Sequence, residues 1–194
     1  PTATYTNFNQ KIEVTSNSAG HFYIVFQPAG ALAVDTSCGY HSSGGSWTPG
    51  AAIPVYSGTN QTPFYVAGSP FGSANYGTDA NSIRSRILGF GARLFYDGTE
   101  LNRGGTVQFL ASPNKQSVIG SSANDLATFR QTRIDSLSSL GKEGLIGQVT
   151  RPILVEEDMQ FLRHNGSSWI IAGLSTGVTT LDNEYWIAIT GTIA

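Results

Sequence analysis

The sequence predicts an all-β protein, and three observations lead to this prediction. Apolar residues alternate with polar or small ones at a period of two, which is typical of half-buried strands. Turn-forming pairs such as Asp97-Gly98 and Asn165-Gly166 separate these alternating runs. Helical spacing is confined to one stretch, near Asn124–Gln131. The 194 residues show no internal repeat or linker and therefore predict one domain over residues 1–194.

The clearest strand pattern spans Arg84–Tyr96. Every even position from 88 to 96 is apolar, whereas the odd positions include two glycines and Arg93, so we expect the even side to face the core. The segment Glu184–Ile193 repeats this alternation. Further strands are expected at His21–Gln27, Ala31–Asp35, Ala52–Tyr56, Thr106–Ala111, Gln148–Val155, Gln160–Arg163, Ser168–Leu174 and Gly177–Leu181.

Short helices are expected only in the connections. The run that starts at Ser122 provides capping residues, and apolar residues follow at helical spacing to about Gln131. Leu137 and Leu140 predict a second short turn. The region Thr36–Asn81 is rich in Gly, Ser and Pro and is expected to be loop with one or two short strands. Eight to ten strands with long connections indicate an antiparallel sandwich or barrel.

Composition limits the classes of function. Charged residues make up only 12% of the chain, about half the usual share of a soluble domain. A surface so poor in charge suits contact with further copies of the chain, although a neutral secreted β-domain has the same composition. The net charge of −2 provides no general attraction to nucleic acid. The single cysteine, Cys38, excludes an internal disulfide framework, and the longest apolar run, His21–Phe26, is too short to span a bilayer.

Motifs that would indicate an enzyme are weak. Gly173-Leu-Ser-Thr-Gly177 has the spacing of a nucleophile elbow, but β-branched residues follow it where that elbow needs a helix. A hairpin turn explains the motif better. Cys38 and His41 lie three residues apart in a glycine-rich loop, and a catalytic pair there is left open but is not favoured. We therefore expect no enzymatic activity.

The densest acidic cluster consists of Glu156, Glu157 and Asp158. Neighbouring carboxylates can bind calcium, especially where a second subunit adds an oxygen ligand across an interface. Adjacent side chains of a strand point to opposite faces, so the three converge only on a turn, and a solvated turn is the simpler interpretation. Asp97 and Glu100 form a weaker acidic candidate. No cofactor is required by the sequence, and calcium at subunit interfaces is the metal that it suggests.

One passage carries a family resemblance: Ser-Ile-Arg-Ser-Arg-Ile-Leu-Gly-Phe-Gly-Ala-Arg-Leu-Phe-Tyr-Asp-Gly-Thr-Glu-Leu-Asn-Arg-Gly-Gly-Thr-Val-Gln-Phe-Leu, residues 82–110. It consists of a long strand, a nine-residue connection over Asp97–Gly105 and a second strand. The passage resembles the strand–loop–strand of single jelly-roll capsid (coat) proteins of small icosahedral viruses. These are the nodavirus-like and tombusvirus-like shell domains, including nematode-virus and algal small-DNA-virus relatives. The later elements follow in a similar order to a closing strand at Tyr185–Ile193, so that the resemblance covers residues 82–193.

The resemblance implies a structural capsid protein with an eight-stranded antiparallel jelly-roll sandwich and one or two short helices in the connections. It implies self-assembly in the host cell into an icosahedral virion shell, in a multiple of sixty copies, that encloses a viral genome and involves no membrane. Relatives usually contact the genome through a basic N-terminal arm, and many add a protruding domain; we expect neither in this chain. Candidate subunit-interface or genome-facing residues are Arg84, Arg86, Arg130 and Arg133.

Two alternatives belong to other classes of function. A carbohydrate-binding β-sandwich, lectin-like or adhesin-like, would use loop aromatics as a sugar platform, with Trp47, Tyr56, Phe64, Tyr65 and Tyr76 as candidates. Buried aromatics that anchor loops have the same composition. A β-sandwich hydrolase would require two carboxylates that face each other across a cleft, about 5 to 10 Å apart, and no pair in the sequence indicates one.

Overall fold

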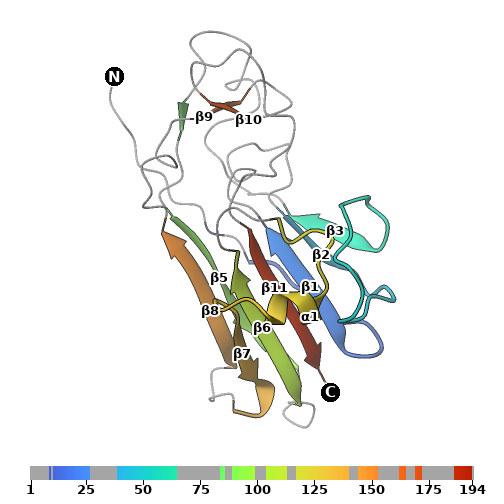
Figure 1. Ribbon diagram of the computed structural model, residues 1–194. Coiled ribbons are helices and arrows are strands. Elements are labelled where there is room, and N and C mark those ends of the chain that lie inside the picture. The colour runs from blue at the N-terminus through green and yellow to red at the C-terminus, as the bar shows by residue number, and fades with distance from the viewer. Residues whose placement is uncertain are drawn as a thin grey trace.

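The computed structural model describes residues 9, 11–26, 39–64, 84–85, 89–98, 104–112, 117–139, 144–152, 162–164, 169–171 and 186–193. These residues contain eleven strands and one short α-helix, and the paired strands are antiparallel (Figure 1). The predicted all-β class is confirmed. The eight-stranded jelly roll remains a prediction, because the described strands are divided among three sheets, and the single domain over 1–194 also remains a prediction.

The largest sheet has six strands in the order β3-β2-β1-β11-β6-β7. In that order the strands are β3 (Gln61–Phe64), β2 (Gly39–Ser42), β1 (His21–Phe26), β11 (Ile187–Ile193), β6 (Gly105–Ala111) and β7 (Arg133–Ser136). A second sheet pairs β5 (Gly89–Phe95) with β8 (Leu145–Pro152). A third sheet contains β10 (Trp169–Ile171), β9 (Leu162–His164) and β4 (Arg84–Ser85).

Both faces of the six-stranded sheet are buried at its centre. Along β1, Phe22 and Ile24 belong to one hydrophobic cluster, whereas Tyr23 and Val25 belong to another. Trp186 and the start of β11 repeat the division, with the sequence Trp-Ile-Ala-Ile over residues 186–189. Because successive side chains of a strand point to opposite faces, the two clusters lie on opposite faces of the sheet. A strand buried on both faces needs an apolar residue at nearly every position, as these segments have.

The β5–β8 sheet covers one of these faces. Phe90, Ala92, Leu94 and Tyr96 pack against the cluster that contains Phe22, Ile24, Val107, Phe109, Leu137, Ile146, Ile187 and Ile189. The rings of Phe26 and Phe90 meet edge to face, with centroids 6.1 Å apart. The even positions of the predicted long strand therefore face the core, as the alternation predicts. The side chains between the two sheets therefore form the core of a β-sandwich.

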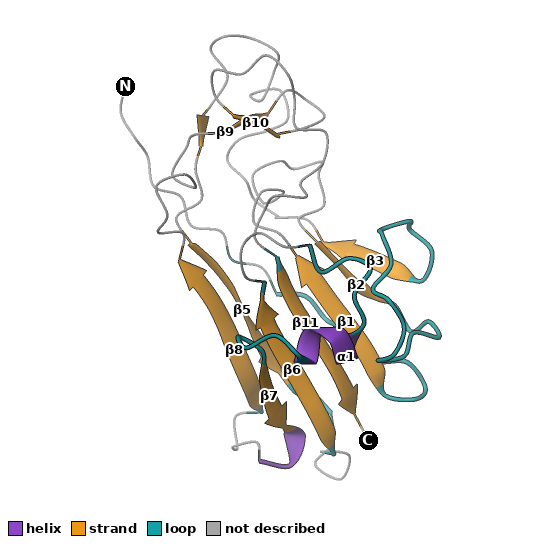
Figure 2. Cartoon of the chain, in the orientation of Figure 1, coloured by secondary structure: helices purple, strands orange, loops and turns teal. Residues whose placement is uncertain are grey.

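The opposite face is covered by helix α1 (Ala123–Ala127) and by loops (Figure 2). Leu126 of the helix and Ile53 and Val118 of the loops are at most 1% exposed and pack on this face. The helix begins with a capping box: Ser122 accepts a hydrogen bond from the Asp125 backbone, and the Asp125 carboxylate accepts from the Ser122 backbone. The predicted start of the helix is therefore confirmed.

Several predicted elements differ from the structure. The prediction of a strand at Ala52–Tyr56 is wrong. Ala52 forms only an isolated bridge with Ser122. The side chain of Ile53 is buried, and its backbone forms hydrogen bonds with residues 120 and 121. The helix ends at Ala127, because the hydroxyl of Thr128 donates to the Asp125 carbonyl and closes the last turn. Strand β7 was not predicted. The strands expected at Ala31–Asp35 and Gly177–Leu181 lie outside the described residues.

Candidate functional site

The outer face of the β5–β8 sheet carries exposed apolar side chains. Phe95 on β5 is 56% exposed and Leu145 on β8 is 40% exposed. The two residues are register partners in the antiparallel pair, so their side chains lie side by side on the same face. Within the described part of the chain, large hydrophobic residues are also exposed at Val55, Tyr56 and Ile134. Phe95 and Leu145 are the two that form a cross-strand pair.

A β-bulge places this apolar pair on the outside. The register shifts between Leu94, which pairs with Gly147, and Phe95, which pairs with Leu145. Ile146 is the additional residue on β8, and it is buried in the cluster between the sheets. The bulge therefore lets Ile146 reach the core while Leu145 stays beside Phe95, a redirection of side chains that bulges commonly provide.

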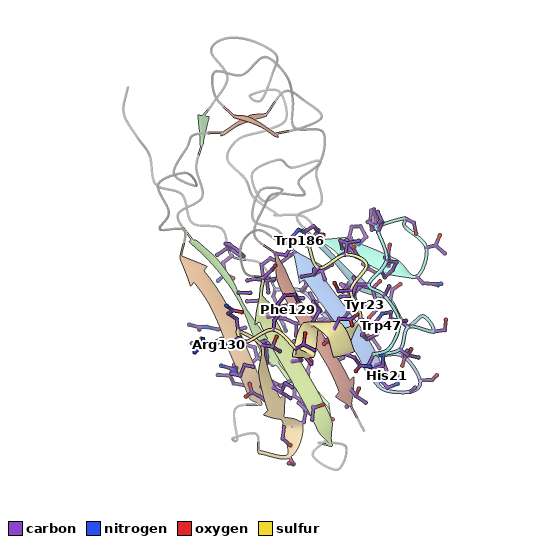
Figure 3. The ribbon with its side chains drawn as sticks, viewed as in Figure 1. His21, Tyr23, Trp47, Phe129, Arg130 and Trp186 are labelled. Carbon is purple, nitrogen blue, oxygen red and sulfur yellow. The ribbon has the colours of Figure 1, made fainter. Side chains whose placement is uncertain are left out.

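The candidate arginines have different environments. Arg133 lies on the edge strand β7, where its Nε donates to Oδ2 of Asp135 at 2.8 Å and its guanidinium lies 5.0 Å from the centre of the Phe109 ring. The charge of Arg133 is thus paired within the chain, and charges at this position discourage the addition of another strand to the edge. Arg130, labelled in Figure 3, is exposed. The ion pairs found among the described residues join Lys11 to Glu13 and Arg133 to Asp135, and neither includes Arg130. The side chains of Arg84 and Arg86 are outside the described part, and the interface role of all four stays a prediction.

The acidic cluster of Glu156, Glu157 and Asp158 lies outside the described residues, so calcium binding there also stays a prediction. Among the residues that the structure describes, no group of three His, Cys, Asp or Glu side chains is arranged to hold a metal ion. Asp97, the weaker acidic candidate, is exposed at the end of β5, and Glu100 lies outside the described residues.

The two loop aromatics whose side chains the structure describes, Trp47 and Tyr56, pack against neighbouring rings and do not form an exposed platform together. Trp47 packs edge-on against Tyr23, with ring centroids 5.1 Å apart, and both belong to the face covered by α1 (Figure 3). The indole nitrogen of Trp47 is buried, so it is not presented to a sugar hydroxyl. Tyr56 is 40% exposed and leans against Tyr40, with centroids 5.4 Å apart. The side chain of Phe64, and Tyr65 and Tyr76, lie outside the described part.

Two buried tyrosines support this loop layer as neutral donors and acceptors. Burial raises the pKa of Tyr40 well above its usual value, and the neighbouring Tyr23 raises it further. The Tyr40 hydroxyl donates to the Pro54 carbonyl at 2.6 Å. The Tyr23 hydroxyl accepts from Nε2 of Gln61 at 3.1 Å, and burial raises the pKa of Tyr23 as well. Phenols held in this state are structural groups and are poor general bases at neutral pH.

The described histidines also have structural partners. Nδ1 of His41 lies 2.8 Å from the Ser42 carbonyl, so this nitrogen carries the proton, and the side chain is buried. Nδ1 of His21 lies 3.1 Å from the Thr192 hydroxyl. This contact joins the first residue of β1 to the end of the adjacent strand β11. Cys38, of the candidate pair with His41, and the elbow-like motif 173–177 lie outside the described residues.

Comparison with protein-family models found no matching family, and comparison with curated proteins found no match to the chain. The described part contains no helix that is long and apolar enough to cross a membrane. The strand order and the surface of the chain are therefore the observations on which a function can be proposed.

Proposed function

We propose that this chain is the shell subunit of a small icosahedral virus capsid, built on an eight-stranded jelly roll. The observation that carries the proposal is the pairing of β1 with β11, the first and last of the long strands that the structure describes, at the centre of the six-stranded sheet. A jelly roll consists of two Greek keys, in which an antiparallel ribbon is wrapped so that strands from the two halves of the chain pair in nested order, as β1–β11, β5–β8 and β6–β7 do.

The route of the chain between the sheets supports the same topology. Strand β5 belongs to the smaller sheet, β6 and β7 belong to the larger one, and β8 returns to the smaller one. Phe95 pairs with Leu145, so both crossings occur at the same end of the two sheets. In this proposal β1, β11, β6 and β7 form one four-stranded sheet of the jelly roll, and β5 and β8 contribute to the other.

The surface suits an assembled protein. The low charge of the chain and the exposed Phe95–Leu145 pair favour contact with other copies, and many weak contacts act together in a closed shell. The proposal includes a multiple of sixty copies, packaging of the viral genome through basic residues, and calcium at subunit interfaces through Glu156, Glu157 and Asp158. It assigns no catalytic group to the chain.

The state of assembly tests the proposal. The expressed chain, with flanking sequence where the natural protein has it, should be analysed at neutral pH by negative-stain electron microscopy and light scattering, with calcium and with a chelator. We expect closed particles of at least about 1.2 MDa, sixty times the 20.6 kDa mass of the chain. A species that remains monomeric at every concentration, with and without calcium, would overturn the proposal. Loss of particles on chelation alone would locate calcium at the interfaces.

A further inference from the structure

The outward face of β5 carries a row of side chains with a self-complementary order. Arg93, Phe95 and Asp97 occupy alternate positions, and all three are exposed. The alternation continues beyond the strand, because Tyr96 still packs inward on the core and its backbone N–H donates to the Gly144 carbonyl at 2.7 Å. The row therefore runs positive, apolar, negative along one face.

Neither charge of this row has a partner in the described part of the chain. The ion pairs there join Lys11 to Glu13 and Arg133 to Asp135, and none includes Arg93 or Asp97. The residue across from Arg93 is Gln148, which is neutral and exposed. An apolar centre flanked by two charges of opposite sign, neither paired with a described residue, is a surface suited to a partner with the same pattern reversed.

The glycines next to the row leave space for a partner's backbone. Gly89 and Gly91 occupy the same outward side of β5 and are exposed. A face without side chains at two alternate positions lets another chain approach closely. The surface is thus flat at one end and apolar at the centre, where Phe95 and Leu145 lie together.

We propose that this row is the contact between two copies of the chain across a two-fold axis that passes beside Phe95. The axis is perpendicular to β5, so rotation by half a turn reverses the direction of the row, and Arg93 of each copy faces Asp97 of the other. Each charge lies about 7 Å along the strand from Phe95, which makes the two halves of the contact equal. This inference rests on the proposed self-assembly and assigns one of the contacts that a closed shell requires.

The same charges oppose the alternative alignment. Two copies placed side by side in the same direction would bring Arg93 against Arg93 and Asp97 against Asp97. Like charges at close range suppress that arrangement, so the row determines direction as well as attraction. Exposed ion pairs are individually weak and are screened by salt, so the apolar pair must supply the central contact.

A charge-exchange experiment tests the contact. The variants are Arg93→Asp, Asp97→Arg and the double exchange, with Lys11→Asp as a control that makes the same charge change at an exposed site elsewhere. Particle mass and the dimer dissociation constant are measured by light scattering and analytical ultracentrifugation at low and high salt. Both single variants should weaken dimerisation at least about tenfold at low salt, and the double variant and the control should restore or retain it.

A cross-linking experiment is independent of the charges. In a Cys38→Ser background, Phe95→Cys should form a disulfide-linked dimer on mild oxidation, because the two-fold axis brings the two copies of this residue together. Val55→Cys, which places a thiol at a loop residue that is more exposed than Phe95, should not. Equal cross-linking of the two variants would overturn the contact.

The outcomes separate this contact from the proposed function. Particles that form equally well in all charge variants would refute the contact and leave the shell proposal standing. Wild-type dimers that follow the exchange pattern without ever forming particles would support the contact and refute the shell. A chain that forms neither dimers nor particles would refute both.

Discussion

Replacement of Ile189 by alanine tests whether the face of the central sheet that β5–β8 covers is buried. Ile189 is 1% exposed and lies on β11 between its register partners Ile24 and Phe109, which share its hydrophobic cluster. The substitution removes three carbons, worth about 0.8 kcal/mol each in transfer from water, and it leaves a cavity between the two sheets. We therefore expect a loss of about 3 to 5 kcal/mol in the free energy of unfolding.

The matched control is Ile134→Ala, which makes the same chemical change on β7 at a side chain that is 57% exposed. It should change the free energy of unfolding by less than about 0.5 kcal/mol. Both variants are measured by urea denaturation, followed by tryptophan fluorescence, at a concentration where sedimentation shows a monomer. An Ile189→Ala loss below about 1 kcal/mol, or equal to that of the control, would refute the packing of β5–β8 on this face.

Three further substitutions test local features, each by its effect on the urea midpoint. Gly105→Ala should cost at least about 2 kcal/mol, because Gly105 has a φ of 106° and a Cβ there would collide with the Thr192 backbone. Gly120→Ala has a similar φ but open space, and equal losses would refute the collision. Ser122→Ala should cost about 1 kcal/mol. Hydrogen bonds from Ser122 lower the pKa of Asp125, so the stabilisation that they provide is fully present above pH 3.8 and is lost as the pH falls further. Ser122→Ala should therefore lose less stability than the wild type on acidification. The raised pKa of Tyr40 means that stability falls as the pH rises above 10.0, and Tyr40→Phe should reduce that alkaline loss. An unchanged pH profile in either variant would contradict its assignment.

Strands with a clear hydrophobic pattern, continuous or alternating, could be predicted from the sequence. In β1, β6 and β11 nearly every residue is apolar or small, and these strands form the buried centre of the large sheet. In β5 the alternation correctly separated the core side from the outer side. Burial on one face gives alternation and burial on both faces gives a continuous apolar run, so these patterns could be interpreted without a structure.

Other elements depend on contacts that local patterns do not contain. β2 has the sequence Gly-Tyr-His-Ser and is fully buried, because it lies between β1 and β3 rather than because its residues are apolar. β7 has the sequence Arg-Ile-Asp-Ser and forms only along the free edge of β6. Ile53 was assigned to a strand because its neighbours alternate, but tertiary packing uses it as a single plug. In each case the long-range partner determines the local conformation.

Only part of the candidate surface on the outer face of the β5–β8 sheet could be predicted from the sequence. The sequence placed Arg93 on the side of β5 opposite the core, and the structure adds Leu145, which reaches that side through a bulge that no local pattern predicts. Arg133 was a candidate for contact with other molecules, and its pairing with Asp135 depends on a spacing of two along an edge strand. Surface charges carry little periodic information, so their partners emerge only from the folded arrangement.

Cryo-electron microscopy of the assembled chain is the most direct test of the central claim. We predict closed particles with icosahedral symmetry, in which each subunit contains two packed antiparallel sheets with β1 and β11 side by side. At a two-fold axis, the outer faces of two β5–β8 sheets should meet at Phe95. A chain that remains monomeric, or that assembles only into open filaments or irregular aggregates, would contradict the assignment as a shell subunit.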